Sequence, residues 1–177
     1  MGKIFKIENE NIVEAIELMS NNSTLKTWEL DLPILERSDN MFLNCTNFES
    51  FSGTTPNLTT AKGMFKECKK LSQFRGNLDK LNSGYEMFYG CSALNDFNTN
   101  LTSLVYGGGM FAVCTSLNSF TSNLNSLVYG EGMFKGCENL TTFNADLSSL
   151  TNGLVMFNSC SNITSFNSDL SSLTDGN

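Results

Sequence analysis

The chain has 177 residues, of which 40% are hydrophobic and only 16% are charged, and its formal net charge at pH 7 is −7. It contains no histidine, which excludes Ser–His and Cys–His nucleophiles and Cys/His zinc sites. The acidic balance argues against direct binding to nucleic acid, because such binding depends on Lys and Arg neutralising phosphates. We therefore expect a protein that is not an enzyme, with no catalytic residues, no metal site and no cofactor.

The N-terminal segment lacks the features of an export signal. Glutamates stand where a signal peptide has its apolar stretch, at Glu8, Glu10, Glu14 and Glu17. No run in the sequence is long and apolar enough for a membrane-spanning helix. We therefore expect a cytoplasmic or virion-associated protein that does not contact a membrane and reaches a cell surface only by another export route.

Residues 1–40 are expected to form an N-terminal cap. Asn11 and Glu14 fit the start of a helix over residues 12–19. One face of that helix would be apolar, with Ile12, Val13, Ile16 and Met19. Residues 18–40 then form a degenerate copy of the repeat that follows, with Asn22 in place of its cysteine and apolar residues at Leu25, Trp28, Leu32 and Leu35.

From residue 41 the sequence repeats with a constant period of 23 residues. The dipeptide Met-Phe occurs at 41–42, 64–65, 87–88, 110–111, 133–134 and 156–157. The six cysteines keep the same register, at Cys45, Cys68, Cys91, Cys114, Cys137 and Cys160. Residues 41–177 therefore hold six repeats without an insertion, which is the signature of a repeat architecture.

One repeat, MFKGCENLTTFNADLSSLTNGLV at 133–155, shows how a coil is built. The spacing of Met133, Phe134 and Cys137 predicts a short helical turn. The rest predicts two brief extended segments joined by a polar turn. A glycine closes each coil, where a tight turn often needs positive φ: Gly63, Gly84, Gly107, Gly130, Gly153 and Gly176.

A single coil is too small to bury its apolar side, so coils must stack to complete a core. Stacking aligns equivalent residues in columns about 4.8 Å apart. One aromatic column is expected at Phe65, Phe88, Phe111, Phe134 and Phe157. A second is expected at Phe51, Phe74, Phe97, Phe120, Phe143 and Phe166.

The spacing of Phe134, Cys137, Leu140 and Phe143, repeated in five other coils, resembles the BspA-type leucine-rich repeat. It is also similar to the Met-Phe-x-x-Cys repeats of mycoplasma-type lipoproteins. The resemblance covers residues 41–177 together with the degenerate coil before them. It implies an α+β solenoid of right-handed coils behind a helical N-terminal cap, and a role in adhesion or protein binding.

The six cysteines have two interpretations. Ladder neighbours would lie within disulfide range, but all six positions are equivalent, and pairing would break that equivalence. We expect a row of reduced structural thiols, which is typical of a reducing compartment. A row of sulfurs does not form the tetrahedron that zinc requires.

Two surfaces are candidates for binding a partner. The first is the polar face of the strands, where solenoids often bind ligands: Gln73, Arg75, Asp96, Asn98, Ser119, Thr121, Thr142, Asn144, Ser165 and Asn167. The second is a rim of tyrosines and lysines: Tyr106, Tyr129, Lys66, Lys69 and Lys70. Asp146 and Asp169, one above the other, fit either a calcium site or ordinary turns in which the carboxylate binds its own backbone.

The leading functional hypothesis is a non-enzymatic protein-binding or scaffold module whose partner is a protein. One alternative is a structural subunit of a virion or appendage that self-associates through an uncapped C-terminal coil, since the chain stops where the next Met-Phe would begin. Another is a small acidic inhibitor of a nucleic-acid-handling protein, because Lys135 is the only Lys or Arg after Lys80.

Overall fold

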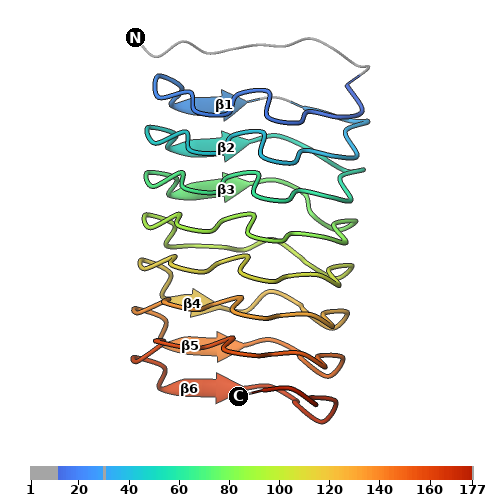
Figure 1. The fold of residues 1–177 in the computed structure, drawn as a ribbon, viewed down its shortest axis with the longest axis vertical. Helices are drawn as coiled ribbons and strands as arrows, with labels where there is room; N and C mark the ends of the chain where they lie inside the picture. Colours follow the sequence, from blue (N-terminus) through green and yellow to red (C-terminus); the bar gives the residue numbers. More distant parts are fainter. Residues whose placement is uncertain (1–11, 30, 177) are drawn as a thin grey trace.

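The structure is a computed structural model that describes residues 12–29 and 31–176. Its coils stack along one axis, with the strands one above the other (Figure 1). The strands are β1 (Thr27–Glu29), β2 (Ser50–Ser52), β3 (Gln73–Arg75), β4 (Ser119–Phe120), β5 (Thr142–Asn144) and β6 (Ser165–Asn167). They pair in parallel in two sheets, β1-β2-β3 and β4-β5-β6, which confirms a repeat solenoid with one strand position per coil.

The pairing register equals the sequence period. Phe51 pairs with Phe74 in the first sheet and Phe120 with Phe143 in the second. A second ladder of single parallel bridges runs along another side of the solenoid, through Glu14, Arg37, Thr60, Ser83, Tyr106, Tyr129, Asn152 and Asp175. This second ladder has the same period as the strand pairing and runs from the first described coil to the last, so it holds each coil in register with the next.

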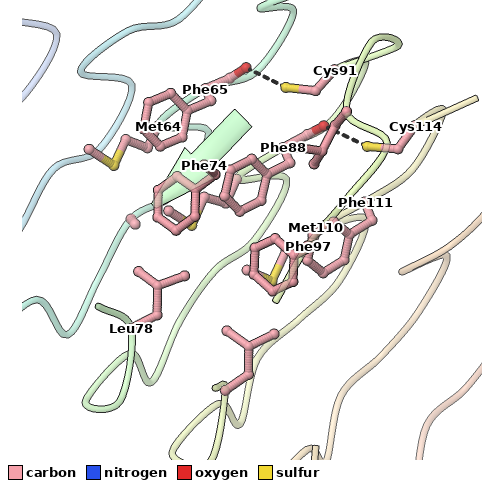
Figure 2. Packing of buried hydrophobic residues seen from close by; sticks show 14 of the residues in the cluster. Met64, Phe65, Phe74, Leu78, Phe88, Cys91, Phe97, Met110, Phe111 and Cys114 are labelled. Atoms are coloured by element: carbon pink, nitrogen blue, oxygen red, sulfur yellow. Dashed lines mark hydrogen bonds between the residues drawn. The ribbon is translucent and has the colours of Figure 1, made fainter. Parts of the chain in front are cut away.

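The predicted aromatic columns lie in the core, where Leu, Met and Cys side chains pack beside them (Figure 2). Phe88 stacks on Phe111 with ring centroids 5.4 Å apart and an interplanar angle of 6°. Rings of the second column meet the first edge to face, as Phe97 meets Phe111 at 4.8 Å and 70°. Such pairs each add about 0.5–1.5 kcal/mol beyond the burial of apolar area.

The segment Met-Phe-x-x-Cys forms consecutive tight turns, and within the described residues the chain has no helix. The predicted helical turns, and with them the α+β class, are therefore wrong. The N–H of Lys66 donates to the carbonyl of Gly63 (3.0 Å) and that of Cys68 to the carbonyl of Phe65 (3.0 Å), whereas the intervening N–H of Glu67 donates to the carbonyl of Tyr89 in the next coil (2.7 Å). Alternate N–H groups thus leave the coil, so a continuous helix cannot form.

These turns depend on a left-handed backbone at two positions of the repeat. Both positions have φ between 49° and 74° in every coil that holds them. The first position contains Glu17, Asn40, Gly63, Glu86, Gly109, Gly132 and Val155. The second contains Asn21, Asn44, Glu67, Gly90, Val113, Gly136 and Ser159. Non-glycine residues pay about 1–2 kcal/mol for this conformation.

The glycines that close the coils have a different role from the one expected. Gly63 has a left-handed φ of +57°, but Gly84, Gly107, Gly130, Gly153 and Gly176 do not. They are needed for space: a Cβ on Gly107 would lie 2.9 Å from Cδ1 of Leu127. The side chains of the next coil pack directly over this column.

The expected N-terminal helix over residues 12–19 is also absent, because this segment is already part of the first coil. The N–H of Ala15 donates to the carbonyl of Arg37 (2.8 Å), one coil onward. Val13 and Ile16, expected on the buried face, are 43% and 47% exposed. The helix-like spacing of apolar residues therefore marks turns here, as it does in the later coils.

Asn11, the expected start of that helix, lies outside the described residues. The degenerate repeat is a true coil: Trp28 lies in the aromatic column and packs edge to face on Phe42 at 5.1 Å. Asn22 replaces the cysteine, and its Oδ1 accepts the backbone N–H of Leu25 at 3.0 Å. The described part of the chain contains no helix able to cross a membrane.

Candidate functional site

The ten predicted strand-face residues lie on one side of the solenoid. Each flanks the Phe of its coil, which is buried except at Phe166, and all ten are exposed except Thr142, which is partly buried. We define the strand face by these residues: Gln73, Arg75, Asp96, Asn98, Ser119, Thr121, Thr142, Asn144, Ser165 and Asn167. Backbone pairing fixes their spacing, so the face is a regular array of polar groups on a rigid support.

In β4–β6 this array is neutral and has short side chains. Ser119 pairs with Thr142, which pairs with Ser165. The amide nitrogen of Asn167 donates to Oδ1 of Asn144 at 3.3 Å. Hydroxyl and amide groups both donate and accept hydrogen bonds, so this part of the face suits a partner with exposed polar groups.

The ladder of strands is interrupted at one coil. Residues 95–98 form no strand, and only a single bridge, between Asp96 and Gln73, joins this coil to β3. The ring of Phe97 lies 6.0 Å from the rings of both Phe74 and Phe120, compared with 5.4 Å between Phe51 and Phe74. The coil therefore stands slightly apart from its neighbours on this side.

A polar hollow of ≈ 390 Å³ opens between this coil and β3. We call it the β3 hollow. Its lining consists of Ser72, Gln73, Phe74, Arg75, Gly76, Asn95, Asp96, Asn98 and Thr99. The sequence identified four of these residues as candidates but gave no reason to place them around a cavity.

The predicted rim lysines are not free cations. Lys66 Nζ lies 2.5 Å from Glu86 Oε2 and 4.9 Å from the ring centroid of Tyr89. The hydrogen bond that Lys66 donates to Glu86 raises the pKa of Lys66. Lys69 and Lys70 have partners too: Nζ of Lys69 lies 3.5 Å from a carboxylate oxygen of Glu67, and Nζ of Lys70 donates to the side chain of Asn47 at 2.7 Å.

We call the side of the solenoid that is formed by the Met-Phe-x-x-Cys turns the turn side. Lys66 lines a hollow of ≈ 540 Å³ there, together with Lys62 and Tyr85. Lys62 and Tyr85 were not predicted to be neighbours, although their 23-residue separation places them in one column. Tyr106 and Tyr129 do not line this hollow. Of the predicted rim residues, only Lys66 lines this hollow.

Tyr106 and Tyr129 form a stacked pair on the second ladder. Their ring centroids are 5.1 Å apart with an interplanar angle of 1°. Both side chains remain exposed, at 48% and 45%. The pair stabilises its two coils through ring stacking and also presents two phenol groups to solvent.

Asp146 and Asp169 form turns of the ordinary kind. Oδ1 of Asp146 accepts the backbone N–H of Ser148 at 2.9 Å, and Oδ1 of Asp169 accepts that of Ser171 at 2.9 Å. Hydrogen bonds from Ser148 lower the pKa of Asp146. Each carboxylate is thus occupied within its own coil, and among the described residues no group of three acidic, Cys or His side chains is placed to hold a metal ion.

All six cysteines are free thiols, as expected, and five are fully buried. Each thiol donates a hydrogen bond to a backbone carbonyl of the preceding coil; Cys91 reaches the carbonyl of Phe65 at 3.1 Å (Figure 2). Burial raises the pKa of Cys91, Cys114 and Cys137. These thiols are structural groups held protonated, not nucleophiles.

The last coil leaves apolar side chains accessible. Phe166 is 43% exposed and Leu170 is 37% exposed. Together with Met156, Phe157 and Leu173 they line a hollow of ≈ 310 Å³. In every earlier coil the next coil covers this surface.

A comparison with protein families gives one result. The family described as "BspA type Leucine rich repeat region" matches residues 5–95 and 82–175, with six copies. No curated protein and no solved structure gives a match to this chain. The match spans nearly the whole chain, and the parallel strand ladder agrees with it. The chain therefore belongs to the BspA-type leucine-rich repeat family.

Proposed function

We propose that this protein is a non-enzymatic interaction module that binds a protein partner through its strand face. The repeat family supports a role in protein interaction or scaffolding. The observation that carries the choice of surface is the exposed, in-register array of polar side chains along β3–β6. Such a surface is already ordered before binding, so little conformational entropy is lost when a partner docks.

The other sides of the solenoid offer less to a partner. On the turn side, Lys66, Lys69 and Lys70 are engaged by neighbouring side chains. A partner that binds there must first compete with those contacts. On the strand face, most outward hydroxyl and amide groups point to solvent, and they can pair with a partner at little cost.

Position-specific photocrosslinking tests the proposal. A photoreactive residue at Thr121 or Asn144 samples the strand face, and one at Glu131 or Lys135, both exposed, samples the turn side. In lysate of the source cells we expect a discrete protein adduct from the first pair, competed by excess unlabelled protein, and none from the second. Adducts confined to the turn side, or no adduct from the strand face, would contradict the proposal.

A further inference from the structure

The β3 hollow departs from the repeat in a way that the fold does not require. The two outward positions beside the Phe carry short residues in most coils, as Ser119 and Thr121 do on either side of Phe120. At the hollow they carry Gln73 and Arg75 on one wall and Asp96 on the other. Since the core beneath is the same Phe column, packing does not account for the longer side chains of Gln73 and Arg75 or for the charge of Asp96.

The polar side chains of the hollow have unused hydrogen-bonding capacity. Among the described residues that line it, only Ser72 and Thr99 form side-chain hydrogen bonds within the protein, each 3.4 Å long and each to a backbone carbonyl. Within the described part of the chain, the guanidinium, carboxylate and amide groups of the walls have no such partner, in contrast to Lys66 and Lys70. Polar groups that converge on one concave space and have no protein partner are available to bind a ligand.

The chemistry of the walls selects an uncharged, polyhydroxylated ligand. Arg75 and Asp96 contribute opposite charges, so an anion or a cation is favoured by one and opposed by the other. A neutral ligand that both donates and accepts can use both. Guanidinium, carboxylate and amide groups are each planar and present two hydrogen-bonding atoms side by side, which matches two neighbouring hydroxyls of a sugar ring.

The base of the hollow also suits an uncharged, polyhydroxylated ligand such as a sugar. Phe74 lines it and is 6% exposed, because Gly76 has no side chain: a Cβ there would lie 2.4 Å from Cζ of the ring. The small exposed part of this ring offers an apolar contact to the C–H groups of a sugar. A volume of ≈ 390 Å³ lies at the lower end of small-molecule sites, which run from about 300 to 1,000 Å³.

We propose that the β3 hollow binds a neutral carbohydrate unit, held by Gln73, Arg75, Asp96 and Asn98 against the edge of Phe74. The site lies on the strand face but does not depend on the proposed protein partner. It adds a second kind of recognition, of a sugar carried by a partner or present as a free saccharide. Because the hollow is open to water, we expect a dissociation constant of about 1 mM for a single sugar unit.

Nuclear magnetic resonance of the isotope-labelled full chain provides the test. Amide resonances are followed during titration with neutral pentoses, hexoses and N-acetylhexosamines and their disaccharides. The expected result is a saturable shift confined to residues 72–76 and 95–99. The double variant Asp96→Ser, Asn98→Thr copies the pair found at Ser119 and Thr121, so the coil retains residues that the fold accepts, and we expect at least tenfold weaker binding.

The matched control is Thr142→Ser with Asn144→Thr, which makes the same pair in β5 and should leave sugar binding unchanged. No saturable shift with any neutral sugar at about 10 mM, ten times the expected constant, would overturn the proposal. So would binding at the hollow of uronic acids or short peptides in place of neutral sugars. The titration contains no protein partner, so its failure leaves the photocrosslinking result unaffected.

Discussion

The thiol of Cys114 donates a hydrogen bond to the carbonyl oxygen of Phe88, 3.2 Å away in the coil before it (Figure 2). The same bond, over the same 26 residues of sequence, joins Cys137 to Phe111 at 3.2 Å. The cysteine column therefore satisfies buried carbonyls of the turn segments while filling space beside the Phe column. This dual role explains why the repeat uses a small, weakly polar donor at this position.

Replacing Cys114 with Ala should lower the free energy of unfolding by about 1–2 kcal/mol, because the variant loses a buried hydrogen bond and leaves a small void. Urea denaturation followed by circular dichroism measures this. Cys160→Ala is the matched control, since Cys160 makes the same bond but is only partly buried. Equal losses of unfolding free energy in the two variants would show that burial of the thiol does not add to stability.

Stability should fall at alkaline pH. Burial raises the pKa of Cys91, Cys114 and Cys137 in the folded state, above the value of about 8.5 for an exposed thiol. As the pH rises, the thiols of the unfolded chain lose their protons first. The contribution of these thiols to the free energy of unfolding is therefore fully present below pH of about 8.5 and declines as the pH rises toward the pKa of the folded state. Each buried thiol adds about 1.4 kcal/mol per pH unit to that decline.

Urea denaturation between pH 7 and 10 measures this slope. The variant Cys91→Ala should be less stable than the parent at pH 7 but should lose stability less steeply above pH of about 8.5. Parallel curves for the two proteins would mean that the thiol titrates equally in the folded and unfolded states.

Substitutions at the left-handed positions should change stability in opposite directions. Val155 has φ of 49° and Gly132, at the same position one coil earlier, has φ of +60°. Val155→Asn should stabilise the protein by about 1 kcal/mol, because Asn tolerates this conformation better than a β-branched residue. Gly132→Val should destabilise it by about 1–2 kcal/mol through backbone strain alone, since a Cβ there meets nothing closer than 3.9 Å.

Thermal unfolding of both variants, with the parent as reference, gives the comparison. The pair is informative because neither change removes a core contact. If Gly132→Val were neutral, the turn would have to relax out of the left-handed region, and the account of the Met-Phe-x-x-Cys segment as tight turns would lose its basis.

Phe111 should be among the most sensitive positions in the chain. It stacks on Phe88 and Phe134 at 5.4 and 5.5 Å and meets Phe97 and Phe120 edge to face. Phe111→Ala should cost about 3–5 kcal/mol, as measured by urea denaturation. Phe166→Ala should cost far less, because that ring is 43% exposed in the last coil.

The columns of the solenoid could be predicted because a constant period implies alignment without any knowledge of local geometry. The conformation inside a coil could not. Met64, Phe65 and Cys68 have a spacing that helices and consecutive turns share, and only the left-handed φ at Gly63 and Glu67 separates the two. The same ambiguity produced the wrong helix over residues 12–19.

The sequence predicted which residues lie on the strand face but not that some of them surround a hollow. Alternation around the buried Phe residues identifies outward positions, so Arg75 and Asp96 could be placed on the strand face. The β3 hollow depends on the distance between two coils, which widens where Phe97 stacks at 6.0 Å. No local pattern encodes that spacing, although the charged residues at these positions, unlike the short residues of β4–β6, are a signal visible in the sequence.

The register of adjacent coils is the claim on which the strand face, the columns and the β3 hollow all depend. Paired cysteines introduced at Ser119 and Thr142, which are register partners, test it by mild oxidation and mass spectrometry of the intact chain. Parallel neighbours lie about 4.8 Å apart, within the range of a disulfide, so this pair should cross-link. Cysteines at Ser119 and Asn144, offset by two residues along β5, should not; cross-linking of the offset pair in preference to the aligned one would contradict the account.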